Sequence, residues 1–390
     1  MREFAEFKEG YRREILFLLT ENCNLDCVYC YEKHKNGEAL SAEFIKQEIS
    51  REMLSDDPCK LTSVSFFGGE PLLRFPVIRE VVDWFFNASW PSSTADFIFQ
   101  ITTNGTLLDE RMKRWFAAHH EHVILGLSMD GTKDAQDRNR SNSYDTIIRH
   151  IDFFRENWPT QPMKMTIGPD TLDQTYDGVV HIHSLGLLVE PDVIFEDVWG
   201  DAESTSRAVR IWAEQLDRLV DFYFTHPELH RPKLLTRELY RLFEPAGEKK
   251  TTFCGAGRYT STYTADGNKY PCFRFAPVCV PQPLYDVLAS PDIENQQCSQ
   301  CAFERICSSC EGFNYEVTGS CFNRTSYHCR FFQVSLLASA KLLMLDHPED
   351  LMPLPEALSK DETLERMRRL LAIRTVNDLC DPEELGAGAV

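Results

Sequence analysis

Residues 23–30 read Cys-Asn-Leu-Asp-Cys-Val-Tyr-Cys, with three and then two residues between successive cysteines. The stretch follows an apolar run at 14–20 that predicts a β-strand. Iron-sulfur clusters are ordinarily held by four thiolates, so three thiolates this close can hold three irons of a cubane cluster and leave the fourth open. The simpler alternatives are a zinc site completed by His34 or a chance group of cysteines. The stretch therefore predicts a metal-binding loop after the first strand.

From residue 14 to about residue 200, short apolar runs alternate with amphipathic stretches. The runs predict strands, and apolar residues at three- and four-residue spacing between them predict helices. The predicted strands are 14–20, 63–67, 97–102, 123–129, 163–167 and 193–195, and the predicted helices are 42–53, 77–86, 109–118, 144–155 and 176–185. Six strand–helix units in a row indicate a parallel sheet with helices outside it. In such folds the functional residues lie in the loops after the strands.

Three polar runs follow these predicted strands: Gly-Gly-Glu-Pro at 68–71, Thr-Asn-Gly at 103–105 and Ser-Met-Asp-Gly at 128–131. Adjacent glycines allow a backbone to approach a ligand closely, and the glutamate beside them can accept hydrogen bonds from a cationic amine. Taken singly, each run is also compatible with an ordinary turn. A fourth run, Asp-Arg-Asn-Arg at 137–140, offers guanidinium groups that can pair with a carboxylate.

The composition excludes several classes of protein. Hydrophobic residues make up 43% of the 390 residues and charged residues 26%, which is typical of a globular protein. The formal net charge of −19 argues against nucleic-acid binding and favours an electropositive partner such as a basic peptide. The N-terminus lacks the pattern of a signal peptide, and no apolar run is long enough to span a bilayer. We therefore predict a cytoplasmic protein, with no membrane partner, whose 14 cysteines are reduced.

Nine of these cysteines lie between residues 254 and 329, among Gly, Pro, Ser and Asn residues with little helical periodicity. They are Cys254, Cys272, Cys279, Cys298, Cys301, Cys307, Cys310, Cys321 and Cys329. Such a segment cannot build an apolar core of its own, so we expect bound metal to hold it together. A pair of zinc ribbons is the alternative, because paired Cys-x2-Cys also suits zinc. Cys59 and Cys380 lie on predicted helices and are interpreted as small apolar residues.

The cysteine triplet, with Tyr29 before its last member, resembles the radical S-adenosylmethionine (SAM) superfamily. The resemblance implies a partial (β/α)6 barrel and a 4Fe-4S cluster held by Cys23, Cys27 and Cys30. It also implies that SAM chelates the open iron and is cleaved reductively to a 5′-deoxyadenosyl radical, which abstracts hydrogen. The cofactor supplies the chemistry, and the protein supplies orientation and exclusion of water.

The same resemblance implies which residues contact SAM. The polar runs occupy the positions of the superfamily's cofactor-binding loops, and Arg140 is preferred over Arg149 as the partner of the methionine carboxylate. The implied contacts are Tyr29, Gly68, Gly69, Glu70, Asn104, Ser128, Asp130 and Arg140. No general base is assigned.

The second group of cysteines resembles the SPASM domain, which implies two auxiliary 4Fe-4S clusters and three clusters in all. Auxiliary cluster II would be held by Cys298, Cys301, Cys307 and Cys329. Auxiliary cluster I would be held by Cys254, Cys272 and Cys310, with Cys279 or Cys321 as a fourth ligand. If neither ligates, an iron is open to a substrate thiolate.

The resemblances imply a division of the chain into a short N-terminal segment (1–13), the partial barrel (14–245), the SPASM domain (246–335) and a C-terminal helical segment (336–390). Enzymes that join these two domains mostly act on peptides or protein side chains. We therefore expect a precursor peptide as substrate and a flavodoxin or ferredoxin as reductant.

Three functions are compatible with these features. The preferred one is crosslinking of a ribosomally made peptide, with thioether formation from a cysteine to a carbon atom. The second is formylglycine formation by an anaerobic sulfatase-maturating enzyme. Against it, that pattern has Gln before Gly-Gly-Glu-Pro and Asp after the second cysteine of the auxiliary domain, where this chain has Phe67 and Phe273. The third, of another class, is an iron-sulfur electron-transfer protein.

Overall fold

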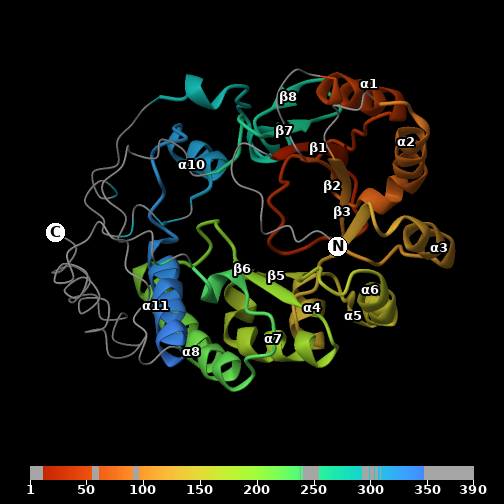
Figure 1. Ribbon diagram of the computed structural model, residues 1–390. Helices are drawn as coiled ribbons and strands as arrows, with labels where there is room; N and C mark the ends of the chain where they lie inside the picture. The colour runs from red at the N-terminus through yellow and green to blue at the C-terminus, as the bar shows by residue number, and fades with distance from the viewer. Residues whose placement is uncertain are drawn as a thin grey trace, which may run out of the picture. The chain divides into compact units, whose positions relative to one another are not determined.

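The computed structural model describes residues 12–54, 61–90, 96–237, 239, 254–291, 298, 303, 306, 307 and 309–346 (Figure 1). Cys59, Cys301, Cys380 and residues 347–390 of the predicted C-terminal helical segment lie outside these ranges. The chain divides into two compact units. The first comprises Met1–Lys164, Ser184–Leu188 and Gly255–Ser290, and the second comprises Met165–His183, Val189–Cys254 and Pro291–Val390.

A mostly parallel sheet forms the centre of the first unit, with strand order β4-β3-β2-β1-β7-β8. β8 runs antiparallel to β7, and the other neighbouring strands are parallel. The strands are β1 (Arg12–Thr20), β2 (Leu61–Gly68), β3 (Asp96–Thr103), β4 (Val123–Leu127), β7 (Thr260–Tyr263) and β8 (Lys269–Tyr270). In β1 the apolar side chains from Ile15 to Leu19 are all buried, as expected of a parallel strand covered on both faces. The predicted α/β fold with a parallel sheet is confirmed.

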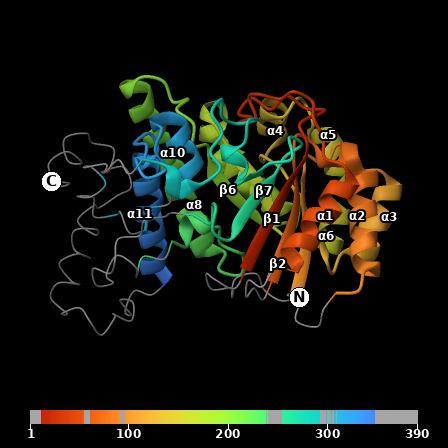
Figure 2. The same ribbon diagram turned by 90° about the horizontal axis from the view of Figure 1, so that it is seen from above.

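Helices follow the strands of this sheet, and α1, α2 and α3 lie along one side of it (Figures 1 and 2). Several begin at side-chain caps, where Ser41, Asp109 and Thr132 each accept a hydrogen bond from a backbone N–H of the first turn. The helices are α1 (Ala42–Met53), α2 (Phe75–Asn87), α3 (Glu110–His119), α4 (Lys133–Asn139), α5 (Tyr144–Ile147) and α6 (Ile151–Asn157), with 3-10 turns η2 (Pro71–Arg74), η3 (Ile148–His150), η7 (Phe273–Phe275) and η8 (Val287–Ala289).

Two predicted elements differ in detail from the structure. The single helix predicted over 144–155 is divided into α5, η3 and α6, and no Pro or Gly in the sequence marks the division. The strand predicted at 193–195 lies earlier, as β6 (Val189–Val193), and includes Pro191. A proline cannot donate to a strand ladder and is found in edge strands, which obscures this strand in the sequence.

Strand β7 was not predicted, and it changes the neighbourhood of the cysteine loop. It pairs in parallel with β1, and Tyr263 stacks on Phe17 with ring centroids 5.4 Å apart. The segment Gly255–Ser290 therefore belongs to the same compact unit as β1 and the loop that follows it. As a consequence, Cys272 and Cys279 lie in one unit with the cysteine triplet.

Beyond β4, Ser128 forms a parallel bridge with Lys164, the second residue of β5 (Met163–Ile167). β5 and β6 form a separate two-stranded sheet. The strands predicted in the first half of the chain are thus present in the predicted order. Closure into a (β/α)6 barrel remains a prediction.

In the second unit the helices α8 and α11 pack side by side (Figures 1 and 2). The indole N–H of Trp212 on α8 lies within hydrogen-bonding distance of Phe331 O (3.2 Å) and Ser335 Oγ (3.3 Å) on α11. Lys341 on α11 pairs with Asp217 on α8 at 2.8 Å. The helices and 3-10 turns of this unit are η4 (Pro169–Gln174), α7 (Thr175–Ser184), α8 (Ala202–Thr225), η5 (Lys233–Leu235), α10 (Glu311–Thr318) and α11 (Cys329–Asp346). No helix in the described ranges combines the length and apolar character needed to cross a membrane.

Candidate functional site

The cysteine triplet lies in the loop after β1, and all three thiols are half-buried. Cys30 N donates to Cys27 O at 3.0 Å, which closes a tight turn between these two residues. Burial raises the pKa of the Cys27 thiol to about 11, and the charges of Cys23 and Cys30 add to the rise. The three thiols therefore lie close enough to influence one another electrostatically.

The Gly-Gly pair at 68–69 allows the loop after β2 to lie directly against the start of the cysteine loop. Gly69 N donates to Thr20 O at 2.8 Å. A Cβ atom on Gly69 would come within 2.2 Å of Asn22 O, and one on Gly68 within 2.4 Å of Thr20 O. Gly68 also has a φ of +112°, which favours glycine. The close approach in the structure is thus between two backbone segments, and the approach to a ligand remains a prediction.

Glu70 is fully buried, and hydrogen bonds from three donors hold its carboxylate. Oε1 accepts from Leu72 N at 2.9 Å and from Thr103 Oγ1 at 2.7 Å, and Oε2 accepts from Asn104 N at 2.8 Å. Burial raises the pKa of Glu70, and the hydrogen bonds from Asn104 and Leu72 oppose the rise. Glu70 therefore joins the loop after β2 to the loop after β3. Its predicted contact with the methionine amine is an additional role that these bonds do not test.

Asn104 extends this connection to the cysteine loop. Its Nδ2 donates to Asn24 Oδ1 at 3.0 Å and lies 4.0 Å from Cys23 Sγ, while its Oδ1 accepts from Thr106 N at 2.9 Å. At the end of the next strand, Ser128 N donates to Thr103 O at 3.0 Å. The predicted binding runs after β2, β3 and β4 are therefore brought together beside the triplet, as expected for the carboxyl ends of parallel strands.

Asp130 is the centre of a second, buried network. Its Oδ2 accepts from Tyr29 Oη at 2.5 Å and from Asn139 Nδ2 at 3.1 Å, and it lies 3.1 Å from Arg140 Nε. Its backbone N–H donates to Gln136 Oε1 at 2.7 Å. Three residues predicted to contact SAM, namely Tyr29, Asp130 and Arg140, thus contact one another.

Arg140 is held by this network from two sides. Besides its ion pair with Asp130, its guanidinium lies 5.3 Å from the centroid of the Tyr29 ring, in a cation–π arrangement. Burial opposes its charge, but Asp130 keeps the pKa of Arg140 raised. The alternative, Arg149, lies on η3 and donates from Nε to Asp145 O at 2.8 Å. The pairing of Arg140 with a methionine carboxylate remains a prediction.

The end of α4 and the segment after it also hold the backbone of the cysteine loop, which the sequence did not indicate. Val28 N donates to Asn139 O at 3.1 Å, and Asp26 N donates to Ser141 Oγ at 3.0 Å. Ser141 and Asn142 have φ angles of 52° and 56°, in the left-handed region that costs non-glycine residues about 1–2 kcal/mol each. Asn139 belongs to the polar run at 137–140, in which the sequence pointed only to the arginines, and no local pattern marks Ser141.

Tyr31, Phe67 and Phe273 form an aromatic cluster next to the triplet. The ring centroids are 5.3 Å apart for Tyr31 and Phe273 and 4.8 Å apart for Phe67 and Phe273. The Arg274 guanidinium lies 5.0 Å from the centroid of the Tyr31 ring. Each ring comes from a residue adjacent to a predicted site element: Cys30, Gly68 and Cys272. Segments distant in the sequence thus meet next to the triplet.

The predicted auxiliary ligands are divided between the two units. Cys272 and Cys279 belong to the first unit, and Cys254, Cys298, Cys307, Cys310, Cys321 and Cys329 belong to the second. Cys279 and Cys321, the two alternatives for the fourth ligand, are 1% and 0% exposed. In the ranges that the structure describes, no group of three or more His, Cys, Asp and Glu side chains forms a site for a single metal ion. The auxiliary ligand sets remain predictions.

The surroundings of the triplet suit an iron-sulfur cluster. Thiolates are the usual ligands of such clusters, and N–H groups directed at their sulfurs stabilise the bound state. Leu25 N donates to Cys23 Sγ at 3.5 Å, and Lys35 Nζ donates to Cys30 Sγ at 3.6 Å. The residues present therefore fit the group that the sequence predicts.

Gly69→Ala is expected to separate the loops that build this site. Because its Cβ would collide with the Asn22 backbone, we expect a loss of about 1–3 kcal/mol of stability and reduced iron retention. The measurements are urea denaturation and iron content after anaerobic reconstitution. Gly126→Ala on β4 is the control, because its nearest neighbour would lie at 3.7 Å. Equal stability and equal iron content in the two variants would contradict the expected collision at Gly69.

Comparison with protein families and known proteins agrees with the site geometry. Residues 17–181 match the model of the Radical SAM superfamily. Radical SAM cyclopropyl synthase TigE of Paramaledivibacter caminithermalis is 20% identical over 228 residues, 53% of this chain and 47% of the relative. The cysteine-type anaerobic sulfatase-maturating enzyme of Clostridium novyi is 27% identical over 143 residues, 34% of this chain and 37% of the relative. The chain thus spans less than half the length of these two relatives.

Similar folds occur in solved structures. A structure described as native anSMEcpe with bound AdoMet and Kp18Cys peptide gives a TM-score of 0.65 at 15% identity, covering 86% of this chain and 99% of the other. Streptococcus suis SuiB bound to precursor peptide SuiA gives a TM-score of 0.56 at 15% identity, covering 82% and 76%. These structures share the fold, and the match to the family model, together with the cysteine loop and the loops gathered beside it, shows that residues 17–181 form a domain of the Radical SAM superfamily.

Proposed function

We propose that this chain is a radical SAM enzyme that crosslinks a ribosomally made precursor peptide, forming a thioether between a cysteine and a carbon atom. The superfamily implies SAM and a 4Fe-4S cluster, and the bound cofactors supply a 5′-deoxyadenosyl radical that abstracts hydrogen. Cys23, Cys27 and Cys30 would hold the cluster. A peptide substrate is supported by two solved structures of similar fold that hold a peptide, namely SuiB bound to precursor peptide SuiA and anSMEcpe bound to Kp18Cys peptide.

The buried networks around the triplet would orient the cofactors. Glu70 fixes the loops after β2 and β3 to each other, and Asp130 fixes the cysteine loop to the end of α4 through Tyr29 and Asn139. Because both carboxylates are buried and hydrogen-bonded, they would restrain these loops in one arrangement. Such preorganisation is what a radical enzyme requires, since the reactive group must be positioned and kept from water.

The cysteine-rich segment would hold two auxiliary clusters with the ligand sets predicted from the sequence, and a flavodoxin or ferredoxin would supply electrons. The contact between residues 31–34 and 273–278 supports this proposal. His34 N donates to Val278 O at 3.0 Å, and Tyr31 stacks on Phe273. Within the first unit, the segment that carries the predicted auxiliary ligand Cys272 therefore packs against the triplet loop.

The observation that favours crosslinking over formylglycine formation is the contact between Phe67 and Phe273. These residues occupy the positions that hold Gln and Asp in the sulfatase-maturating pattern, and their rings lie 4.8 Å apart. At two positions where that pattern has polar residues, this chain thus has phenylalanines that contact each other. Neither phenylalanine can act as a base. Formylglycine formation is the second candidate, supported by the similarity to the Clostridium novyi enzyme and to anSMEcpe.

Mass spectrometry of peptide products distinguishes the candidates. The reconstituted protein would be incubated anaerobically with SAM, dithionite and either a cysteine-containing precursor peptide or a sulfatase-type peptide. Thioether formation removes two hydrogens and keeps the sulfur, whereas conversion of cysteine to formylglycine removes the sulfur. If the precursor peptide keeps its sulfur and loses two hydrogens, the proposal is supported. If the sulfatase-type peptide loses its sulfur, the proposal is contradicted.

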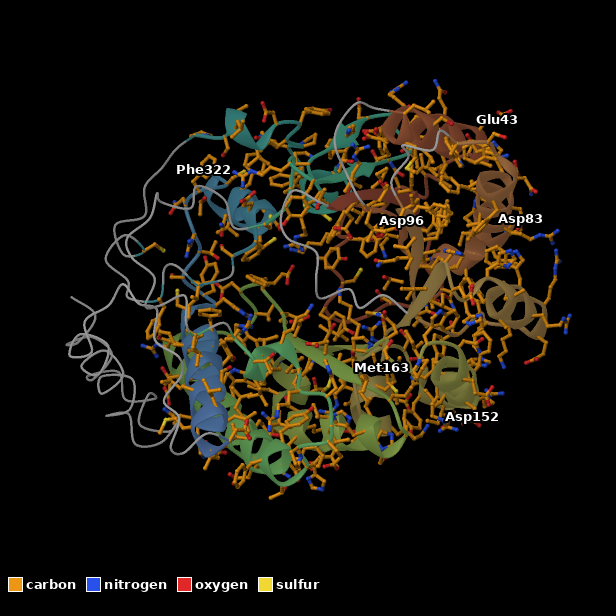
Figure 3. The ribbon with its side chains drawn as sticks, viewed as in Figure 1. Glu43, Asp83, Asp96, Asp152, Met163 and Phe322 are labelled. Carbon is orange, nitrogen blue, oxygen red and sulfur yellow. The ribbon has the colours of Figure 1, made fainter. Side chains whose placement is uncertain are left out.

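Binding of the peptide is expected to weaken with added salt, because the net charge of −19 attracts a basic leader. Acidic side chains, among them Glu43 on α1, Asp83 on α2 and Asp152 on α6, lie on the outer helices of the first unit (Figure 3). Fluorescence anisotropy of a labelled precursor peptide, measured over a range of ionic strength, checks this expectation. An affinity that is independent of salt would contradict it.

A further inference from the structure

Lys35 has an unusual position for a lysine, between a cluster ligand and a buried acid. Its Nζ donates to Cys30 Sγ at 3.6 Å and lies 3.4 Å from Glu32 Oε2. The side chain of Glu32 is only 5% exposed, and that of Lys35 is 29% exposed. An ammonium group therefore faces a thiol of the triplet and is held there by a carboxylate that is largely shielded from water.

The backbone holds this lysine in place from both sides. Before it, His34 N donates to Val278 O at 3.0 Å. After it, Asn36 N donates to Glu21 Oε2 at 2.6 Å, and Glu21 N donates to Glu38 O at 2.9 Å. The segment is thus fixed to the loop after β1 and to the segment around Val278, so the position of Lys35 is set by the fold.

A charge in this position acts on the oxidation state of a cluster held by the triplet. One-electron reduction adds one negative charge to a 4Fe-4S cluster. A nearby ammonium stabilises the reduced state, and hydrogen bonds to ligand sulfurs are a known determinant of cluster potential. The buried Glu32 carboxylate acts in the opposite direction. Because Glu32 is buried, its effect is only weakly screened by salt, whereas the more exposed Lys35 is screened more strongly.

We propose that Lys35 and Glu32 are a charge pair that sets the reduction potential of the cluster bound by Cys23, Cys27 and Cys30. The proposal rests on the proposed function, since it requires that cluster. A low-potential reductant of the flavodoxin or ferredoxin class would supply one electron to a cluster held by these cysteines, and Lys35 and Glu32 would set how readily that electron is accepted. Lys35 and Glu32 are positioning residues in this step and do not react.

The test is a potentiometric titration of the reconstituted full chain, followed by electron paramagnetic resonance. The signal of the triplet cluster is identified by its response to SAM and by its absence in the variant C23A/C27A/C30A. We expect K35M to lower the reduced-to-oxidised ratio at a fixed potential about tenfold, which corresponds to a shift of about 59 mV for a one-electron couple. K35R should retain most of the wild-type potential, and E32Q should shift it upward.

The opposite signs of K35M and E32Q separate an electrostatic role from a structural one, because loosening of the loop would shift both variants in the same direction. K46M is the control for lost charge, since Lys46 pairs with Glu80 between α1 and α2. The inference would be overturned if K35M and K46M had the same reduction potential. It would also be overturned if K35M and E32Q shifted the potential in the same direction. If K35M fails to retain iron, K35Q and E32Q provide the same comparison. A wild-type protein without a SAM-responsive cluster would instead overturn the proposed function.

Discussion

Cys27→Ala is expected to remove one complete cluster from the reconstituted protein. Three clusters correspond to about twelve irons per chain, so the variant should retain about eight. The physical reason is that two thiolates and an exchangeable ligand do not hold a cubane in competition with chelators in solution. Iron analysis after gel filtration, together with the visible absorbance of the protein, measures the effect.

Cys279→Ala is the matched control for this experiment, because Cys279 is a buried cysteine of the same unit outside the triplet. Its loss should leave the SAM-responsive cluster intact, whether or not it ligates auxiliary cluster I. If C27A retained the wild-type iron content and the response to SAM, the triplet would not be the ligand set. A wild-type content near four irons would instead contradict the auxiliary clusters.

Asp130→Ala is expected to have the largest effect on stability of any substitution near the site. It would leave the Arg140 guanidinium buried without its ion-pair partner and remove the acceptor of Tyr29 and Asn139. Removal of one member of a buried ion pair costs about 3–5 kcal/mol. Urea denaturation followed by tryptophan fluorescence measures the loss, and iron retention should fall because the cysteine loop is no longer fixed.

Asp134→Ala is the control for Asp130→Ala. Asp134 pairs with Arg138 at 3.0 Å on the exposed face of α4, where such a pair contributes less than about 1 kcal/mol. We expect its stability to stay within about 0.5 kcal/mol of the wild type. A loss in D130A no larger than that in D134A would show that the buried network does not stabilise the cysteine loop.

The sequence predicted the central sheet because several of its strands contain short apolar runs, of which the run in β1 is continuous from Ile15 to Leu19. β7 was missed for the opposite reason. Its residues, Thr-Ser-Thr-Tyr, have no apolar alternation, and pairing with β1 is a long-range contact that no local pattern encodes. The division of the helix predicted at 144–155 was missed because nothing in its composition interrupts the helical period.

The candidate site was predictable to the level of loops. The triplet and the polar runs after β2, β3 and β4 meet because the carboxyl ends of parallel strands share one edge. The contacts within the site were not predictable. Tyr29 and Asp130 are separated by 101 positions, and their hydrogen bond depends on how α4 packs beside the cysteine loop. The sequence assigns the Gly-Gly pair to ligand approach, which stays a prediction; the structure shows in addition that the pair permits close contact with the backbone at Thr20 and Asn22.

The triplet is proposed to support reductive cleavage of SAM, and formation of 5′-deoxyadenosine under anaerobic conditions measures that reaction directly. Wild-type protein with dithionite and SAM should form 5′-deoxyadenosine, and the variant C23A/C27A/C30A should form none above background. Absence of 5′-deoxyadenosine from the wild-type reaction, in protein that carries its full iron content, would contradict the account.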